Sequence, residues 1–298
     1  MAYSFNISSG VLPSGRTAYY GQLINSNEAK FTIGYRTKYN DNFGLYNVNV
    51  TTGLIYKPDD YRATHGFWSD FIFPTSYAES KGSFYCLNTY DRAKFTFSFM
   101  QYAAHVPNGD FVKFLKKLLQ LPLAADYFPR LMLDQNRVFY RNANQTLTQL
   151  ENDISTQPLM DYLNPTLTEI DQQESICSAR MVHWAQHDPL HRATQAQLAV
   201  EHFQANMPRY HDRLDLHLAP AKVCIVVCDI LHQGRGTFDR IASALNTNGN
   251  WDQAFNNLLL IGNVNYASRI SSLKKKITEG LASGILNKTY QSGSNTFI

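Results

Sequence analysis

Polar and apolar residues alternate in short stretches over the first part of the chain. Residues 30–35 read Lys-Phe-Thr-Ile-Gly-Tyr, and residues 46–51 read Tyr-Asn-Val-Asn-Val-Thr. An alternation with a period of two, bounded by residues such as Gly, Asn and Ser, predicts β-strands joined by turns. We therefore expect residues 1–75 to form a small part made of strands and loops.

The pattern changes to a helical period near residue 110. Apolar residues recur at helical spacing over residues 111–119, and three lysines lie on the opposite face. This spacing predicts a helix that begins at Asp110 and ends before Pro122. Residues 122–165 contain four prolines and no clear period, so we expect them to be irregular.

Beyond residue 165 the pattern is mainly helical. The stretch 223–231 is apolar on nearly every side, which is typical of a buried central helix, and Gly234 is suited to end it. Asp188 followed by Pro189 predicts a helix start, because Asp caps a helix and Pro fits its first position. The remaining predicted helices are residues 166–187, 238–245, 251–261 and 266–282.

These patterns predict an α+β fold that is mainly α-helical. The chain has 298 residues, of which 44% are hydrophobic, so it is long enough to bury a sizeable core. We expect a single domain over residues 1–298, with a strand-and-loop part over 1–75 and a helical core over 76–286. Residues 287–298 are expected to be a loosely ordered tail.

Charge, hydropathy and cysteine content argue against a nucleic-acid-binding, membrane-inserted or disulfide-rich protein. A net charge of +3 is too small for a typical nucleic-acid binder, although it suits an acidic polysaccharide. No apolar run is long enough for membrane insertion, and the N-terminus lacks the pattern of a secretory signal. The four cysteines, Cys86, Cys177, Cys224 and Cys228, are too few and too scattered for a disulfide framework, which predicts synthesis in a reducing cytoplasm. Cys224 and Cys228 lie one helical turn apart in an apolar stretch, which favours buried free thiols over metal ligation.

The segment from Glu79 to Gln101 carries the strongest chemical signal. It contains one Glu among aromatic residues, then Asp91 beside Arg92, and then a Phe-rich run that closes with Met-Gln. A carboxyl group in apolar surroundings stays protonated, whereas one beside basic residues stays ionised. Cleavage of a glycosidic bond needs one carboxyl group in each of these two states.

This segment resembles the catalytic segment of goose-type lysozymes and related lytic transglycosylases. The resemblance implies a lysozyme-like helical domain in which Glu79 donates a proton and Asp91 holds the attacking water. Asp70 is the alternative second carboxylate. The residues that the resemblance places along the sugar are Gln101, Tyr90, Phe97, Ser98 and His105.

One part of the segment departs from that family. Relatives usually carry Gly where Thr96 and Ser98 stand, which lets the backbone approach the sugar closely. Residues 95–99 also fit a plain strand, with three phenylalanines pointing inward and Thr96 and Ser98 pointing outward.

The implied activity is hydrolysis of the β-1,4 bond between N-acetylmuramic acid and N-acetylglucosamine in peptidoglycan, without a metal or organic cofactor. A lytic transglycosylase, a chitosanase or chitinase on the same scaffold, and a wall-binding phage or structural protein without activity remain alternatives. For an enzyme that cleaves the cell wall, the lack of a secretory signal predicts release by phage lysis or injection by a secretion machine. It would then act in the periplasm or on the wall of a target cell. Injection implies a cognate immunity protein in the producer.

Histidine spacing suggests a second kind of site. His183, His187 and His191 are four residues apart, as zinc ligands on one helix often are. The predicted helix break at Asp188-Pro189 separates the third from the first two, so ordinary histidines are the favoured interpretation. His232, beside the Gly-Arg-Gly turn at 234–236, is a candidate to border the cleft. No motif for a Ser nucleophile is present.

Overall fold

The computed structural model describes residues 2–48 and 53–298. Its contacts divide the chain into two compact units. The first unit contains residues 1–55 and 83–198, and the second contains residues 56–82 and 199–298. Each unit is therefore assembled from two stretches that are far apart in the sequence.

The first unit is built on an antiparallel sheet of seven strands whose spatial order follows the chain. Together with the helices described below, this sheet confirms the predicted α+β class. The strands are β1 (Phe5–Val11), β2 (Thr17–Leu23), β3 (Phe31–Tyr39), β4 (Asn42–Tyr46), β5 (Leu87–Asn88), β6 (Thr96–Phe97) and β7 (Tyr102–Ala103).

The predicted strand over residues 30–35 is confirmed as the first part of β3. Of the predicted strand over residues 46–51, Tyr46 is the last residue of β4, and the prediction is wrong for residues 47 and 48. The rest of that prediction, residues 49–51, lies outside the described residues.

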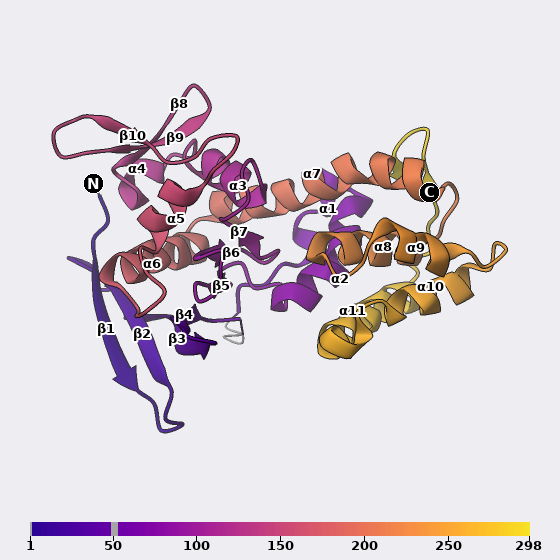
Figure 1. Ribbon diagram of the computed structural model, residues 1–298, viewed down its shortest axis with the longest axis horizontal. Coiled ribbons are helices and arrows are strands. Elements are labelled where there is room, and N and C mark those ends of the chain that lie inside the picture. The colour runs from indigo at the N-terminus through magenta and orange to yellow at the C-terminus, as the bar shows by residue number, and fades with distance from the viewer. Residues whose placement is uncertain (1, 49–52) are drawn as a thin grey trace. The chain divides into compact units, whose positions relative to one another are not determined.

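The first unit also contains helices. They are α3 (Asp110–Leu118), α4 (Ala124–Tyr127), α5 (Gln157–Leu163), α6 (Gln172–His187) and residues 189–198 of α7 (Pro189–Leu214). Helix α6 packs against β1, β2 and β3 (Figure 1). The side chain of Asp171 caps α6 by accepting a hydrogen bond from the backbone N–H of Gln173 at 2.6 Å. The buried face of this helix includes Met181 and Trp184.

Residues 122–165 are more regular than the sequence predicts. They contain a three-stranded antiparallel sheet of β8 (Leu131–Asp134), β9 (Arg137–Arg141) and β10 (Leu147–Gln149). The prolines of this region flank the strands and do not interrupt them. Most side chains of these short strands are partly exposed, so the apolar alternation that would reveal them is weak.

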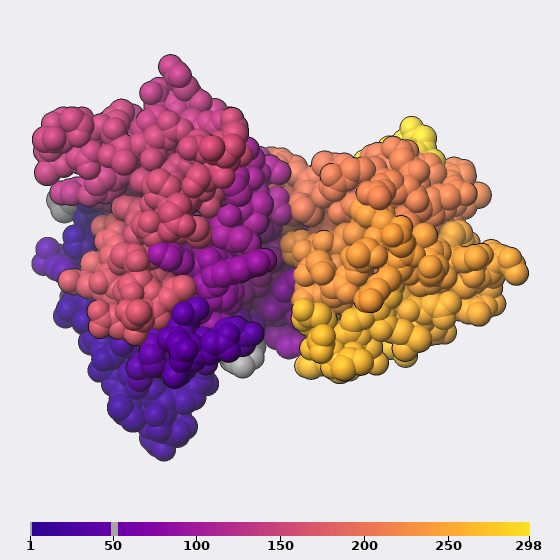
Figure 2. Space-filling view, viewed as in Figure 1, coloured from indigo at the N-terminus to yellow at the C-terminus, as the bar shows by residue number. Residues whose placement is uncertain are grey.

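The second unit is mainly helical. It contains η1 (Pro58–Asp60), α1 (Arg62–His65), α2 (Phe67–Ser80), the rest of α7, α8 (Ala221–Gln233), α9 (Phe238–Leu245), α10 (Trp251–Leu260) and α11 (Asn263–Ala282). Helix α2 packs against α8 and α11, and α10 packs against α8 and α9 (Figure 1). In Figure 2 the orange and yellow atoms of the C-terminal helices form a closely packed body.

Helix α8 confirms the predicted buried helix. Nine of its residues are buried, including Cys224 and Cys228 one turn apart, and Gly234 ends it in the left-handed conformation with φ 72°. Cys224 and Cys228 are buried free thiols as predicted, and Cys86 and Cys177 are buried and free as well. Among the described helices, none combines the length and apolar character that crossing a bilayer requires.

The prediction of a loosely ordered tail is wrong. Strands β11 (Tyr290–Gln291) and β12 (Thr296–Phe297) pair as an antiparallel hairpin. Phe297 contacts the rings of Phe67, Trp68 and Phe71, and Tyr290 is fully buried. Two apolar residues that are too few to form a sequence pattern therefore anchor the end of the chain to the second unit.

Candidate functional site

Glu79 lies in the last turn of α2, in the second unit. Its side chain is 15% exposed, so it is neither sealed in the core nor free in solvent. Its Oε1 atom is 2.8 Å from Nη1 of Arg269 on α11 and 3.6 Å from Nε2 of His232 on α8. The packing of α2 against α8 and α11 thus brings together three polar side chains that are far apart in the sequence.

Arg269 links Glu79 to a second, fully buried carboxylate. Its Nη2 atom lies 2.6 Å from Oδ1 of Asp229, and the other oxygen of Asp229 accepts a hydrogen bond from Arg235. Burial opposes the charged form of Arg269, but Glu79 and Asp229 outweigh this effect and raise the pKa of the guanidinium. The surroundings of Glu79 are therefore an ion-pair network and differ from the apolar pocket that the sequence predicts.

Asp91 belongs to the first unit, in the loop between β5 and β6. Its carboxylate accepts hydrogen bonds from the backbone N–H of Ala93 at 2.9 Å and from the side chain of Asn88 at 3.1 Å. These contacts hold a local turn and leave the side chain partly exposed. The two predicted catalytic carboxylates are thus contributed by different units.

The predicted sugar-contacting residues all belong to the first unit. Phe97 and Ser98 are fully buried, and the ring of Phe97 packs against Phe114 and His191. Gln101 donates a hydrogen bond from Nε2 to the carbonyl oxygen of Ser98 at 3.0 Å. The structure places Phe97 and Ser98 in the core, and it places Gln101 in the turn between β6 and β7.

The strand interpretation of residues 95–99 is partly wrong. All three phenylalanines are buried as it predicts, but Thr96 and Ser98 are buried as well. The regular strand covers only Thr96–Phe97, and Ser98 has a φ of 96°, outside the strand conformation. Because the strand conformation is interrupted at Ser98, the three phenylalanines and also Thr96 and Ser98 are buried in the core.

Tyr90 and His105, like Gln101, are partly exposed members of the predicted set. Tyr90 is partly exposed and its ring lies near those of Tyr39 and Tyr46. Burial raises the pKa of Tyr90 to about 12. Burial, together with the nearby charge of Arg92, lowers the pKa of His105, so its imidazole is neutral at pH 7.

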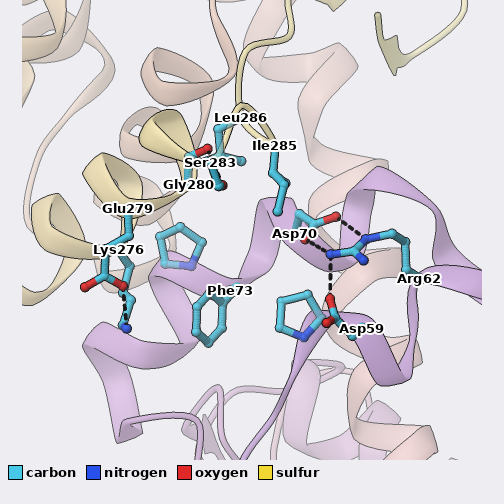
Figure 3. A pocket seen from close by; sticks show the side chains of 12 residues that line it. Asp59, Arg62, Asp70, Phe73, Lys276, Glu279, Gly280, Ser283, Ile285 and Leu286 are labelled. Carbon is cyan, nitrogen blue, oxygen red and sulfur yellow. Dashed lines mark hydrogen bonds and ion pairs between the residues drawn. The ribbon is translucent and has the colours of Figure 1, made fainter.

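Asp70, the alternative carboxylate, lines a cavity of about 190 Å³ in the second unit (Figure 3). Its two oxygens accept hydrogen bonds from Arg62 at 2.9 and 2.8 Å, and Arg62 also contacts Asp59. Phe73, Pro74, Ile285 and Leu286 give the cavity an apolar wall. It is smaller than the usual ligand pocket of about 300–1,000 Å³, and its carboxylate is already engaged.

The structure separates the three histidines that share a spacing. Helix α6 ends at His187 and α7 begins at Pro189, so the predicted break is confirmed. His183 and His187 meet the carboxylate of Glu28, whereas His191 is buried beside Gln195. The sequence gives no sign of Glu28, because its partners lie about 155 residues further along the chain.

A different carboxyl group has a strongly raised pKa. Glu174 on α6 is fully buried and accepts hydrogen bonds from the hydroxyl of Thr89 and the backbone N–H of Leu45. Burial raises the pKa of Glu174 to about 8 despite these hydrogen bonds. Because it has no exposed surface, Glu174 cannot reach a polymer, and its effect is on the stability of the first unit.

Comparisons with protein-family models, curated proteins and solved structures give no match. Any assignment of function therefore depends on the residues and on the geometry described above.

Proposed function

We propose that this protein is a peptidoglycan hydrolase with a lysozyme-like helical region, in which Glu79 transfers the proton that cleaves the β-1,4 glycosidic bond. The observation that carries the proposal is the partly exposed position of Glu79 at the end of α2. Proton donation from Glu79 requires its ion pair with Arg269 to open first, because a carboxyl group beside a guanidinium is held in the ionised form. The likeness of residues 79–101 to the catalytic segment of goose-type lysozymes supports the same assignment.

The contacts of Glu79 suggest how such a proton transfer would proceed. Arg269 and His232 both contact Oε1, so Oε2 is the oxygen that would approach the glycosidic oxygen. Once the proton has left, the carboxylate is stabilised by Arg269.

The likeness to goose-type lysozymes assigns the second carboxylate, which would hold the attacking water, to Asp91. Two hydrogen bonds fix its position, and its side chain keeps some contact with solvent. Asp70 is the alternative, but both of its oxygens accept hydrogen bonds from Arg62. In glycosidases the separation of the two carboxylates decides the stereochemistry, about 6.5–9.5 Å for inversion and about 5–5.5 Å for retention.

A direct test uses purified sacculi and follows the release of soluble fragments. Loss of the proton donor in Glu79→Gln is expected to slow release by about 10²–10⁴-fold, with binding to sacculi retained. The exposed Glu169 provides a matched control, and Glu169→Gln should release fragments at the wild-type rate. Equal rates for wild type and Glu79→Gln would overturn the proposal.

The alternative functions give different results in the same assay. A chitosanase or chitinase would release reducing ends from chitosan or chitin and leave sacculi intact. A wall-binding protein without activity would sediment with sacculi and release nothing, whichever residue stands at position 79.

A wall-cleaving enzyme that acts on other cells also requires protection of the producer. We propose a cognate immunity protein that covers Glu79 and its neighbours, with action in the periplasm of the target cell. Expression directed to the periplasm of a test bacterium should then cause lysis, and cytoplasmic expression should not. Equal tolerance of both would contradict this part of the proposal.

A further inference from the structure

Two histidines and a glutamate converge in the first unit, whereas Glu79 and its partners belong to the second. His183 and His187 lie one turn apart on α6, and Glu28 lies in the connection between β2 and β3. The Oε2 atom of Glu28 is 3.0 Å from Nε2 of His183 and 3.6 Å from Nε2 of His187. One potential ligand atom from each residue lies within 4.8 Å of the others.

The hydrogen bonding of His187 leaves the correct nitrogen available for a metal. Its Nδ1 atom lies 2.9 Å from the backbone carbonyl oxygen of His183. A carbonyl oxygen can only accept a hydrogen bond, so Nδ1 carries the proton and the neutral ring has its lone pair on Nε2. Histidines that bind metals are oriented in this way by a hydrogen bond from the other ring nitrogen.

His183 is held by its surroundings rather than by solvent. Its side chain is 3% exposed, and its Nδ1 atom lies 2.8 Å from the hydroxyl of Tyr127. The rings of Phe5 and Phe31 contact the imidazole, which lies nearly parallel to that of His187 with centroids 3.9 Å apart. Both imidazoles therefore present Nε2 toward Glu28 from fixed positions.

The two separations that involve Glu28 are close to those in a metal site. Ligand bonds of 2.0–2.1 Å in a tetrahedral zinc site place neighbouring ligand atoms about 3.3 Å apart. The two measured contacts with Glu28 lie on either side of this value. Glu28 and His187 are each nearly half exposed, so an ion could enter from solvent and water could complete its coordination.

We propose that Glu28, His183 and His187 form a binding site for one divalent transition-metal ion, with zinc as the best-suited ion. Two imidazole nitrogens and one carboxylate oxygen favour zinc over calcium or magnesium, which prefer oxygen ligands alone. The bound ion would tie the β2–β3 connection to α6. This proposal is independent of the glycosidase assignment, because it involves none of the residues around Glu79.

Isothermal titration of the tag-free full chain with zinc chloride tests this site. We expect one zinc ion per chain and a rise in melting temperature with zinc, but not with the same concentration of magnesium. Glu28→Gln and His187→Ala each remove one ligand from a partly exposed position, so both variants should fold. Each should weaken zinc binding by at least about tenfold, since loss of even an indirect partner costs that much.

A matched control is His217→Ala, because His217 is exposed and its Nδ1 atom lies 3.0 Å from the hydroxyl of Ser292. This control should bind zinc as the wild type does. Cobalt(II) spectra would show nitrogen and oxygen ligands without the strong band of a thiolate. Absence of zinc binding at millimolar concentration, or equal binding by wild type, Glu28→Gln and His187→Ala, would overturn the proposal.

Discussion

In the second unit, the guanidinium of Arg269 contacts the carboxylate of Glu79 at 2.8 Å. The same guanidinium contacts Asp229, whose side chain has no exposed surface. The proposed proton donor is therefore fixed to the core through one side chain on α11. This arrangement positions Glu79 accurately, and it makes the stability of the second unit depend on Arg269.

Replacement of Arg269 is expected to destabilise the protein. The variant Arg269→Met would leave Asp229 buried with only Arg235 as a charged partner. Removing one member of a buried ion pair typically costs about 3–5 kcal/mol. Urea denaturation followed by circular dichroism should show a loss of this order, and the exposed Arg240→Met should lose less than about 0.5 kcal/mol. A similar loss for both variants would contradict this account.

Glu174 is expected to make the first unit less stable as the pH rises. Burial raises its pKa to about 8, whereas an unfolded chain restores the ordinary value of about 4.5. Between these values the folded state holds one proton more than the unfolded state. The free energy of unfolding should therefore fall by up to about 1.4 kcal/mol per pH unit.

The variant Glu174→Gln keeps the shape of the side chain and cannot ionise. From pH 5 to pH 8 the free energy of unfolding, measured by urea denaturation, should fall further for the wild type than for Glu174→Gln. The difference between the two decreases should be at least about 1 kcal/mol. Glu169→Gln should follow the wild type across the same range, because Glu169 is exposed. Parallel pH profiles for the wild type and Glu174→Gln would show that Glu174 is ionised in the fold.

Phe297 is expected to anchor the C-terminal hairpin. Its ring contacts Phe67, Trp68, Phe71 and Tyr290, and its exposed fraction is 7%. Phe297→Ala should lower the free energy of unfolding by about 3 kcal/mol, as truncation of a buried phenylalanine usually does. The neighbouring Ile298 is 70% exposed, so Ile298→Ala should have little effect. Comparable values for the two variants would mean that the hairpin contributes nothing to stability.

The two candidate second carboxylates should separate in activity assays. Asp91→Asn is expected to slow cleavage of sacculi by about 10²-fold or more, because the water would lose its base. Asp70→Asn should leave the rate near that of the wild type, since Asp70 is engaged by Arg62. If Asp70→Asn slows cleavage more than Asp91→Asn does, Asp70 would be the second carboxylate.

The sequence predicts an element correctly where the apolar pattern of that element alone shows which of its residues are buried. The helix over residues 238–245 has the predicted bounds, and α8 is buried as its apolar run predicts. The sequence failed where burial is decided elsewhere in the chain. The sheet over residues 131–149 and the hairpin at 290–297 are too short to show a period, and they form through contacts with other segments.

The candidate sites show the same limit. The spacing of His183 and His187 was visible, but Glu28 joins them only after β2 and β3 have packed against α6. The chain around Glu79 suggested an apolar environment because its neighbours in sequence are aromatic. Its nearest charged partner, Arg269, lies on α11, 190 residues further along the chain. No local sequence pattern can indicate a contact over such a separation.

Mass spectrometry of the muropeptides released from purified sacculi tests the central claim most directly. The account predicts disaccharide-peptide fragments with reducing N-acetylmuramic acid ends from the wild type, and none above background from Glu79→Gln. The same fragments in the same amounts from Glu79→Gln would contradict it.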